Sequence, residues 1–165
     1  MAEQKTNKQN DKKITLNITT PRGVKFTEKA DMIIMRCIDG DLGVLSGHEP
    51  VSAVLGDGIL RIKNNGIEKK LAVFGGIAEI DKRTVNIFST IAQPPEEIDL
   101  ERAEADLREA QATITEKAEE KHVQGLHVLI HRSMVRIQVS MHPGEIEYFG
   151  EDNEDEHKKD KADES

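Results

Sequence analysis

Apolar and polar residues alternate along the N-terminal half of the chain, and this period of two predicts half-buried strands. In the first such segment, 13–19, Ile14, Leu16 and Ile18 alternate with polar residues and therefore share one face. Short apolar segments separated by turn residues follow it. The predicted strands are 13–19, 24–26, 32–37, 51–55, 59–63, 71–74, 77–80 and 85–88. Because no helical period lies between them, they predict an antiparallel β-sandwich, or flattened barrel, over residues 13–92.

Two glycine-containing segments refine this prediction. Asn64-Asn65-Gly66 predicts a tight hairpin, because Asn and Gly tolerate the positive φ angles of a primed turn. The segment 39–50 carries Gly40, Gly43 and Gly47, so we expect a compact surface loop there. A partner could bind the polar residues of this loop, although a simple turn with solvated carboxylates has the same composition. These polar residues are Asp39, Asp41, His48 and Glu49.

After Pro94-Pro95 the period changes to that of an amphipathic helix. The first apolar stripe consists of Leu100, Ala103, Leu107, Ala110 and Ile114. Asp99 is placed as the N-cap, since its carboxylate can accept the N–H of the third helical residue. The charged segment 116–122 predicts a break between two helices. A second stripe consists of Val123, Leu126, Ile130, Met134, Ile137 and Met141. The whole chain is therefore expected to have an α+β fold, with an antiparallel helical hairpin over residues 93–142.

The second helix carries more apolar surface than one partner needs. Val128, Leu129, Val135 and Val139 lie off its main stripe. A lone hairpin buries one face of each helix, so the surplus predicts a second contact surface. The sandwich, another subunit, or each in turn could provide that contact. In the last case the hairpin would be a movable element.

Composition excludes several classes of function. A net charge of −8 and 3% aromatic residues disfavour nucleic-acid binding. Cys37 is the single cysteine, so an internal disulfide is impossible and a reducing cytoplasm is the simplest location. No segment approaches the roughly 18 apolar residues of a membrane span. We expect a disordered polar leader at 1–12 and a disordered acidic tail at 143–165, which solubilises the chain or makes an electrostatic contact.

No set of residues typical of catalysis is visible. There is no phosphate-binding Gly-rich loop with Lys and Ser or Thr, and no Gly-x-Ser-x-Gly motif. His127 and His131 are four residues apart and could share a metal on one helix face. No Glu stands between them in the zinc-protease arrangement, so a solvated or packed pair is favoured and no metal site is predicted. We therefore expect a non-catalytic chain that requires no cofactor.

The order of residues in 39–50 resembles a signature of the epsilon subunit of bacterial F-type ATP synthases. An acid-Gly-acid-Leu-Gly-aliphatic run, 39–44, is followed by Gly47-His48-Glu49-Pro50. The apolar-Gly-Gly step at 72–76 is also common in that family, and the resemblance extends over about residues 13–141. It implies an epsilon-type β-sandwich followed by a movable helical hairpin.

The resemblance also implies a function. The chain would be a non-catalytic rotor subunit that couples the gamma subunit to the membrane c ring during ATP synthesis driven by proton or sodium transport. Its hairpin would inhibit ATP hydrolysis by extending into the alpha/beta catalytic head. Other subunits would hold it peripherally at the cytoplasmic face of the bacterial cell membrane. Asp41 and His48 match family positions that face the polar loops of the c ring, although His48 could instead stabilise the turn.

A second resemblance concerns nucleotide binding. Asp99, Arg102 and Ala103 match the Ile/Leu-Asp-x-x-Arg-Ala motif of epsilon subunits that bind regulatory ATP, and Arg132 and Arg136 match their paired arginines. Guanidinium groups that converge from two helices could clamp a triphosphate. Ser133 and Gln93 depart from the family pattern, where alanine and an acid are usual. The structural alternative is that Asp99 caps a helix and the arginines are solvated or paired with glutamates.

A different class of function remains open at this point. The chain could be a free-standing module that uses its β-sandwich to bind a small ligand or peptide. A rotor subunit would co-sediment with membranes and slow ATP hydrolysis, whereas a free-standing module would do neither.

Overall fold

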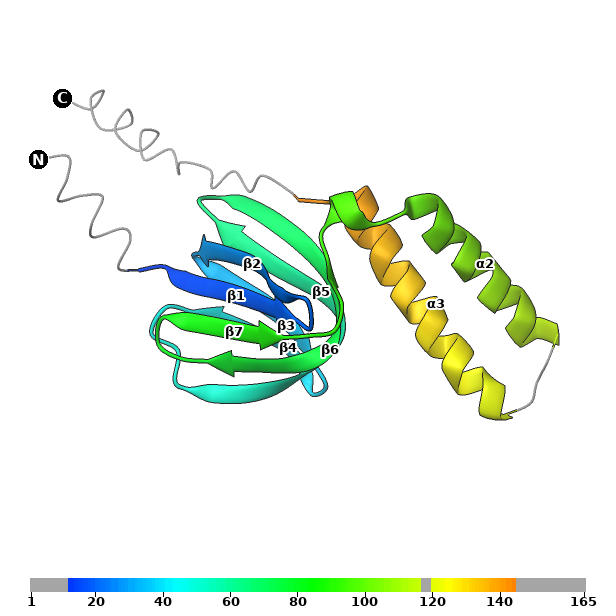
Figure 1. Cartoon of the computed structure of the whole chain (residues 1–165), viewed down its shortest axis with the longest axis horizontal. Coiled ribbons are helices and arrows are strands. Elements are labelled where there is room, and N and C mark those ends of the chain that lie inside the picture. Colours follow the sequence, from blue (N-terminus) through cyan, green and yellow to red (C-terminus); the bar gives the residue numbers. More distant parts are fainter. Residues whose placement is uncertain (1–11, 117–119, 145–165) are drawn as a thin grey trace, which may run out of the picture.

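The computed structural model describes residues 12–116 and 120–144, and it has the predicted α+β fold of a β-sandwich followed by a helical hairpin (Figure 1). The strands are β1 (Ile14–Thr20), β2 (Gly23–Ala30), β3 (Met32–Cys37), β4 (Gly40–Leu45), β5 (Val51–Asn64), β6 (Ile67–Ile80), β7 (Thr84–Phe88) and β8 (Ala92–Gln93). A short 3-10 helix, η1 (Pro95–Glu97), leads to α2 (Leu100–Glu116) and α3 (Glu120–Met141).

The strands form one sheet in the order β2-β1-β7-β6-β5-β3-β4, and β8 pairs with β6 outside this order. Neighbours are antiparallel except β1 and β7, which run parallel. Alternate residues of each strand point into the core, as the period of two predicts. Ile14, Leu16 and Ile18 of β1 are fully buried there. The sequence therefore places the correct face of β1 inside the sandwich.

The predicted segments 51–55 and 59–63 are in fact one long strand, β5, and the segments 71–74 and 77–80 belong to one strand, β6. The glycines between them bend the strands without ending them. Leu55 pairs with Gly76 and Asp57 with Phe74, so the register between the two strands is the same on both sides of Gly56 and Gly75. At Gly76 φ is +123° and a Cβ would lie 2.2 Å from the carbonyl oxygen of Phe88. Because of this bend, β6 pairs with β8 at one end and with β7 at the other.

The prediction of a compact loop over 39–50 is wrong for its first half. Residues 40–45 form β4, which pairs with β3 along its whole length. Val44 is buried while its neighbours face outward, so buried and exposed positions alternate in this strand although two of its residues are glycines. Gly40 and Gly47 take positive φ, as expected, whereas Gly43 lies within the strand. The predicted hairpin at 64–66 is confirmed, since φ is positive at both Asn65 and Gly66.

The two predicted helices are confirmed, and the segment 117–119 between them, where the break is predicted, lies outside the described residues. Every residue of the α2 stripe is buried or half-buried. Asp99 is the N-cap, because its Oδ1 accepts the N–H of Arg102 at 3.0 Å. The α3 stripe is wrong at two positions, since Met134 is 53% and Met141 61% exposed. Ser133 is fully buried instead, because the helix is rotated so that Val135 and Val139 also pack inward.

The predicted leader at 1–12 and the predicted tail at 143–165 lie outside the described residues, apart from Lys12, Pro143 and Gly144. Within the described ranges, neither helix is long and apolar enough to cross a membrane. The carbonyl oxygen of Pro143, two residues after the end of α3, accepts a hydrogen bond from the N–H of Lys70 at 3.2 Å. The end of the hairpin is therefore attached to β6.

Candidate functional site

The hairpin docks on the sandwich through α3, which lies between the sandwich and α2 (Figure 1). The apolar run 71–74 of β6 is buried on both faces. Leu71 and Val73 point into the sandwich core, whereas Ala72 and Phe74 point outward. Val135 and Val139 of α3 cover that outer pair, and we call these four residues the hairpin contact. The predicted second contact surface of α3 is therefore the sandwich, while Val128 and Leu129 stay exposed.

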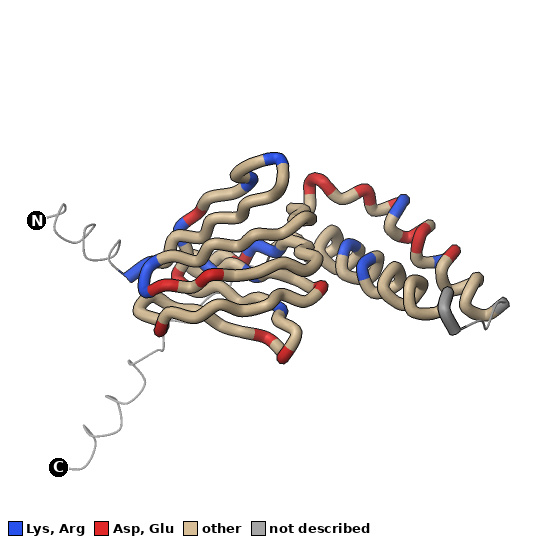
Figure 2. Tube along the Cα trace, turned by 60° about the horizontal axis from the view of Figure 1, so that its bottom comes forward, with Lys and Arg blue, Asp and Glu red and all other residues tan. Residues whose placement is uncertain are grey.

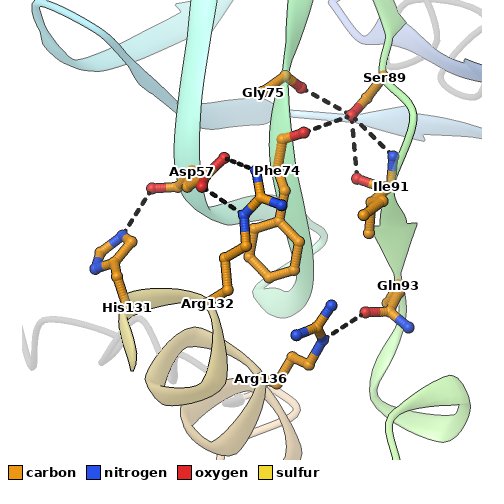
Figure 3. A network of polar contacts seen from close by, with 9 residues as sticks. All are labelled: Asp57, Phe74, Gly75, Ser89, Ile91, Gln93, His131, Arg132 and Arg136. Atoms are coloured by element: carbon orange, nitrogen blue, oxygen red, sulfur yellow. Dashed lines mark hydrogen bonds and ion pairs between the residues drawn. The ribbon is translucent and has the colours of Figure 1, made fainter. Parts of the chain in front are cut away.

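An ion pair borders the hairpin contact (Figure 3). Arg132 of α3 donates from Nε to Oδ2 of Asp57 at 2.7 Å and from Nη2 to Oδ1 at 3.3 Å. Asp57 lies at the bend of β5, and its backbone oxygen is 3.1 Å from Nε2 of the neighbouring His131. We call the Asp57–Arg132 pair the latch. It joins the sandwich to the hairpin.

Arg136 lies one helical turn beyond the latch and has a neutral partner. Its Nε donates to Oε1 of Gln93 at 2.8 Å, and its guanidinium lies 4.7 Å from the centre of the Phe74 ring. Arg132 contacts the same ring at 5.1 Å. Burial lowers the pKa of Arg136, and the nearby charges of Arg132 and Arg102 lower it further, against the opposing effect of Asp106. The site therefore holds a partly desolvated cation with no described carboxylate paired to it.

Ser89 fixes the segment that carries Gln93. Its buried Oγ lies 2.7 Å from the carbonyl oxygen of Gly75 and 3.1 Å from that of Ile91 (Figure 3). The N–H of Phe74 donates to the same Ile91 oxygen at 3.1 Å. The hydrogen bonds hold β8 against β6, so Gln93 faces α3 from a rigid position.

A cavity of about 310 Å³ opens between η1, the start of α2 and Arg136. Figure 2 shows acidic positions along α2 and basic positions on α3, and the cavity carries both signs of charge. It is lined by Gln93, Glu97, Ile98, Asp99, Arg102, Ala103, Asp106 and Arg136. Four of the five residues of the expected nucleotide site thus meet there. The fifth, Arg132, does not line the cavity, because it is engaged by Asp57.

The two residues expected at the c ring lie on β4 and in the loop after it. Oδ1 of Asp41 is 3.0 Å from Nη1 of Arg36, which is its cross-strand neighbour, and both side chains are more than half exposed at 62% and 53%. Nδ1 of His48 is 2.7 Å from the carbonyl oxygen of Glu49. Neither residue lines the cavity at the hairpin.

The expected histidine pair does not act as a unit. His127 is exposed, while His131 contacts the Asp57 backbone. In the described ranges 12–116 and 120–144, no three side chains of His, Cys, Asp or Glu gather where they could hold a metal ion.

Sequence reasoning missed an exposed apolar row on the outer face of the sandwich. Val54, Ile77 and Phe88 are cross-strand neighbours on β5, β6 and β7, and each is about half exposed at 51%, 51% and 46%. Ile38, whose N–H donates to the oxygen of Val54, extends the row. We call these four residues the apolar belt. Its signal in the sequence is large apolar residues at outward positions of three adjacent strands, where alternation predicts polar ones.

These features define a binding subunit built of two parts: a sandwich with an exposed apolar belt and a hairpin docked by one helix. Comparison with known proteins identifies the family. Residues 13–95 match the ATP synthase delta/epsilon chain beta-sandwich domain, and residues 96–141 match the long alpha-helix domain of the same chain.

Two curated relatives are bacterial. The ATP synthase epsilon chain of Caldicellulosiruptor saccharolyticus is 34% identical over 75% of this chain and 90% of the relative. The epsilon chain of Bacillus subtilis is 33% identical over 78% and 98%. A chain in the cryo-EM structure of the Euglena gracilis mitochondrial ATP synthase, OSCP/F1/c-ring in rotational state 1, matches with a TM-score of 0.67 at 27% identity. That match covers 79% of this chain and 82% of the Euglena chain.

The chain belongs to the ATP synthase epsilon chain family. It is a non-catalytic subunit of the central stalk of an F-type ATP synthase.

Proposed function

We propose that the sandwich couples the gamma subunit to the membrane c ring. The apolar belt is the observation that carries this proposal. An exposed aromatic residue beside a row of exposed aliphatic ones is typical of a protein interface. The groove beside Phe88, of about 380 Å³, adds the concave surface that such an interface uses. The presence of F1 and the c-ring in the Euglena structure supports the assignment.

The proposed c-ring contact lies at Asp41 and His48. The exposed Asp41 carboxylate forms an ion pair with Arg36, and its remaining lone pairs can accept hydrogen bonds from a basic group of the c ring. Through these subunits the chain would lie peripherally at the cytoplasmic face of a bacterial membrane.

Co-purification tests both contacts. Phe88→Asp is expected to weaken capture of the gamma subunit at least tenfold, because a carboxylate would be desolvated within the belt. Asp41→Lys is expected to leave capture of the gamma subunit unchanged and to weaken capture of the c ring. Thr27→Asp, a new carboxylate at an exposed position of β2 outside the belt, is the matched control for charge. If Phe88→Asp binds the gamma subunit as the unchanged chain does, the belt is not the contact.

We further propose that the hairpin inhibits ATP hydrolysis and that it can be released from the sandwich; we call this device the releasable brake. The hairpin contact supports this proposal, because α3 contributes two buried valines to it, each worth about 1.5–3 kcal/mol when fully buried. Part of that gain is offset by the cost of ordering the side chains. Release from the sandwich therefore costs little compared with unfolding the β-sheet. Binding partners that contact the released helices could shift the balance.

We propose that the cavity beside Arg136 binds regulatory ATP. Arg102 and Arg136 would contact the phosphates, and Ala103 leaves room at the cavity wall. Asp99 would accept from the adenine amino group through lone pairs not used by the helix cap. Calorimetry with the full chain is expected to show ATP binding that Arg102→Ala and Arg136→Ala weaken. His127→Ala, on an exposed face of α3, is the control. If calorimetry detects no heat of ATP binding by the unchanged chain, the proposed ATP site is wrong.

A further inference from the structure

The cavity at the hairpin is built with one cation turned away from it. Arg136 and Arg102 line the cavity, whereas Arg132, one turn before Arg136 on the same helix, does not. The guanidinium groups of Arg132 and Arg136 lie 5.1 Å and 4.7 Å from the centre of the same Phe74 ring. The difference between them is their partner. Asp57 binds Arg132, and the neutral Gln93 binds Arg136.

The latch uses the same edge of Arg132 that a phosphate would use. Nε and Nη2 donate side by side to the two oxygens of Asp57, at 2.7 and 3.3 Å. This paired geometry is the one by which arginine binds carboxylates and phosphates alike. One edge of a guanidinium can serve one such anion at a time. Asp57 is therefore an anion supplied by the chain itself.

Burial makes this exchange of partners significant. The Arg132 side chain is 34% exposed and that of Asp57 21%, so both charges are partly removed from water. A nearby anion stabilises a partly desolvated cation, and the pair also joins β5 to α3. If a nucleotide takes Arg132, Asp57 loses its partner and the sandwich loses one contact with the hairpin.

We propose that Asp57 competes with the phosphates of a bound nucleotide for Arg132. The inference rests on the proposed ATP site and names the device that regulates it. With the latch closed, the hairpin stays docked without nucleotide, and the cavity offers two arginines. A nucleotide can bind this paired edge of the third arginine only by displacing Asp57.

The first experiment tests the latch without nucleotide. Amide hydrogen exchange of α3 is measured in the full chain and in Asp57→Asn, Arg132→Gln and the double variant. Each single variant is expected to speed exchange at the centre of α3 about tenfold, and the double variant no more than either single one, because both remove the same pair. Unchanged exchange of the β1 amides reports an intact sandwich. Additive effects, or no effect, would overturn the latch.

The second experiment tests competition by calorimetry with Mg-ATP. Asp57→Asn is expected to bind ATP about tenfold more tightly than the unchanged chain, the effect of freeing one charge-assisted pair. Adding Arg132→Ala to Asp57→Asn should abolish the gain. Asp39→Asn, an exposed site with the same change of charge, should leave affinity unchanged.

The outcomes separate the two proposals. If the unchanged chain and Asp57→Asn bind ATP equally, or if the gain survives the loss of Arg132, competition is wrong while the ATP site stands. If neither the unchanged chain nor Asp57→Asn binds ATP, while the latch variants still speed exchange, the ATP site is wrong. The proposed competition is then wrong as well.

Discussion

At the scale of single residues, Glu68 shows how a buried charge is stabilised in this fold. Its carboxylate is 3% exposed and accepts three hydrogen bonds from Arg61 of the neighbouring strand, the shortest at 2.7 Å. Burial acts to raise the pKa of Glu68, but the hydrogen bonds and charge of Arg61, with the charges of Lys70 and Lys63, outweigh it. The pKa therefore lies below its usual value of 4.5.

A pH-dependent contribution to stability follows. Because its folded-state pKa is depressed, Glu68 stabilises the fold above the usual pKa, and this contribution is lost as pH falls through the folded-state pKa. Glu68→Gln is expected to lower the free energy of unfolding at pH 7 by about 1–3 kcal/mol. The difference between the two proteins should shrink below pH 4.5. Urea unfolding at several pH values checks this, and a difference that grows on acidification would contradict it.

Ser133, in contrast to Glu68, lowers the stability of the fold. Its side chain is fully buried, and its Oγ has no hydrogen-bond partner among the described residues. Ser133→Ala is expected to stabilise the hairpin by about 1–2 kcal/mol, because a buried unpaired hydroxyl is costly and alanine favours helix. Unfolding followed by the helical circular dichroism signal measures it. Gln138→Ala, on the exposed face of α3, controls for helix propensity, and a Ser133→Ala gain no larger than the control's would refute the assignment.

At the scale of elements, the double-sided burial of β6 decides where the hairpin sits. Strict alternation would make Ala72 and Phe74 outward and exposed, yet they are covered by α3. Their apolar character is visible in the run 71–74, so the docking strand could have been found from the sequence. The rotation of α3 could not, because Ser133 is buried in a position that hydrophobicity alone assigns to solvent.

The hairpin contact leads to a prediction at this scale. Val139→Ala is expected to shift the equilibrium toward the released hairpin about tenfold, since it removes buried methyl groups worth about 1.5 kcal/mol. Faster amide exchange across α3, with unchanged exchange in β1, is the expected result. Val128→Ala on the exposed face of the same helix should have little effect. Equal effects of the two substitutions would show that Val139 does not hold the hairpin.

The bends in β5 and β6 mark the limit of local reasoning about strands. Glycines at 56, 58, 75 and 76 indicate ends of strands by composition, but here they lie within continuous strands whose mutual register does not change. The distinction depends on the close approach of Phe88 to Gly76, which is a contact between separate strands. In the same way, the motif residues of the proposed ATP site could be identified from the sequence. The capture of Arg132 could not, because Asp57 lies 75 residues away from it.

At the scale of the whole molecule, three surfaces are separated on one small chain. The apolar belt faces outward from β5, β6 and β7, the polar residues Asp41 and His48 lie on and after β4, and α3 covers the other half of β6. In the proposed function, the sandwich stays on the rotor through the first two surfaces. The hairpin can then leave the third without detaching the chain.

The most direct test of the releasable brake is ATP hydrolysis by an F-type catalytic head depleted of its epsilon-type subunit. The rate is measured before and after addition of the full chain, with binding to the gamma subunit followed in the same samples. We expect hydrolysis to slow as the chain binds, while ion-driven ATP synthesis by the same complex in membranes continues. A rate of hydrolysis that stays unchanged at full occupancy of the gamma subunit would contradict the brake.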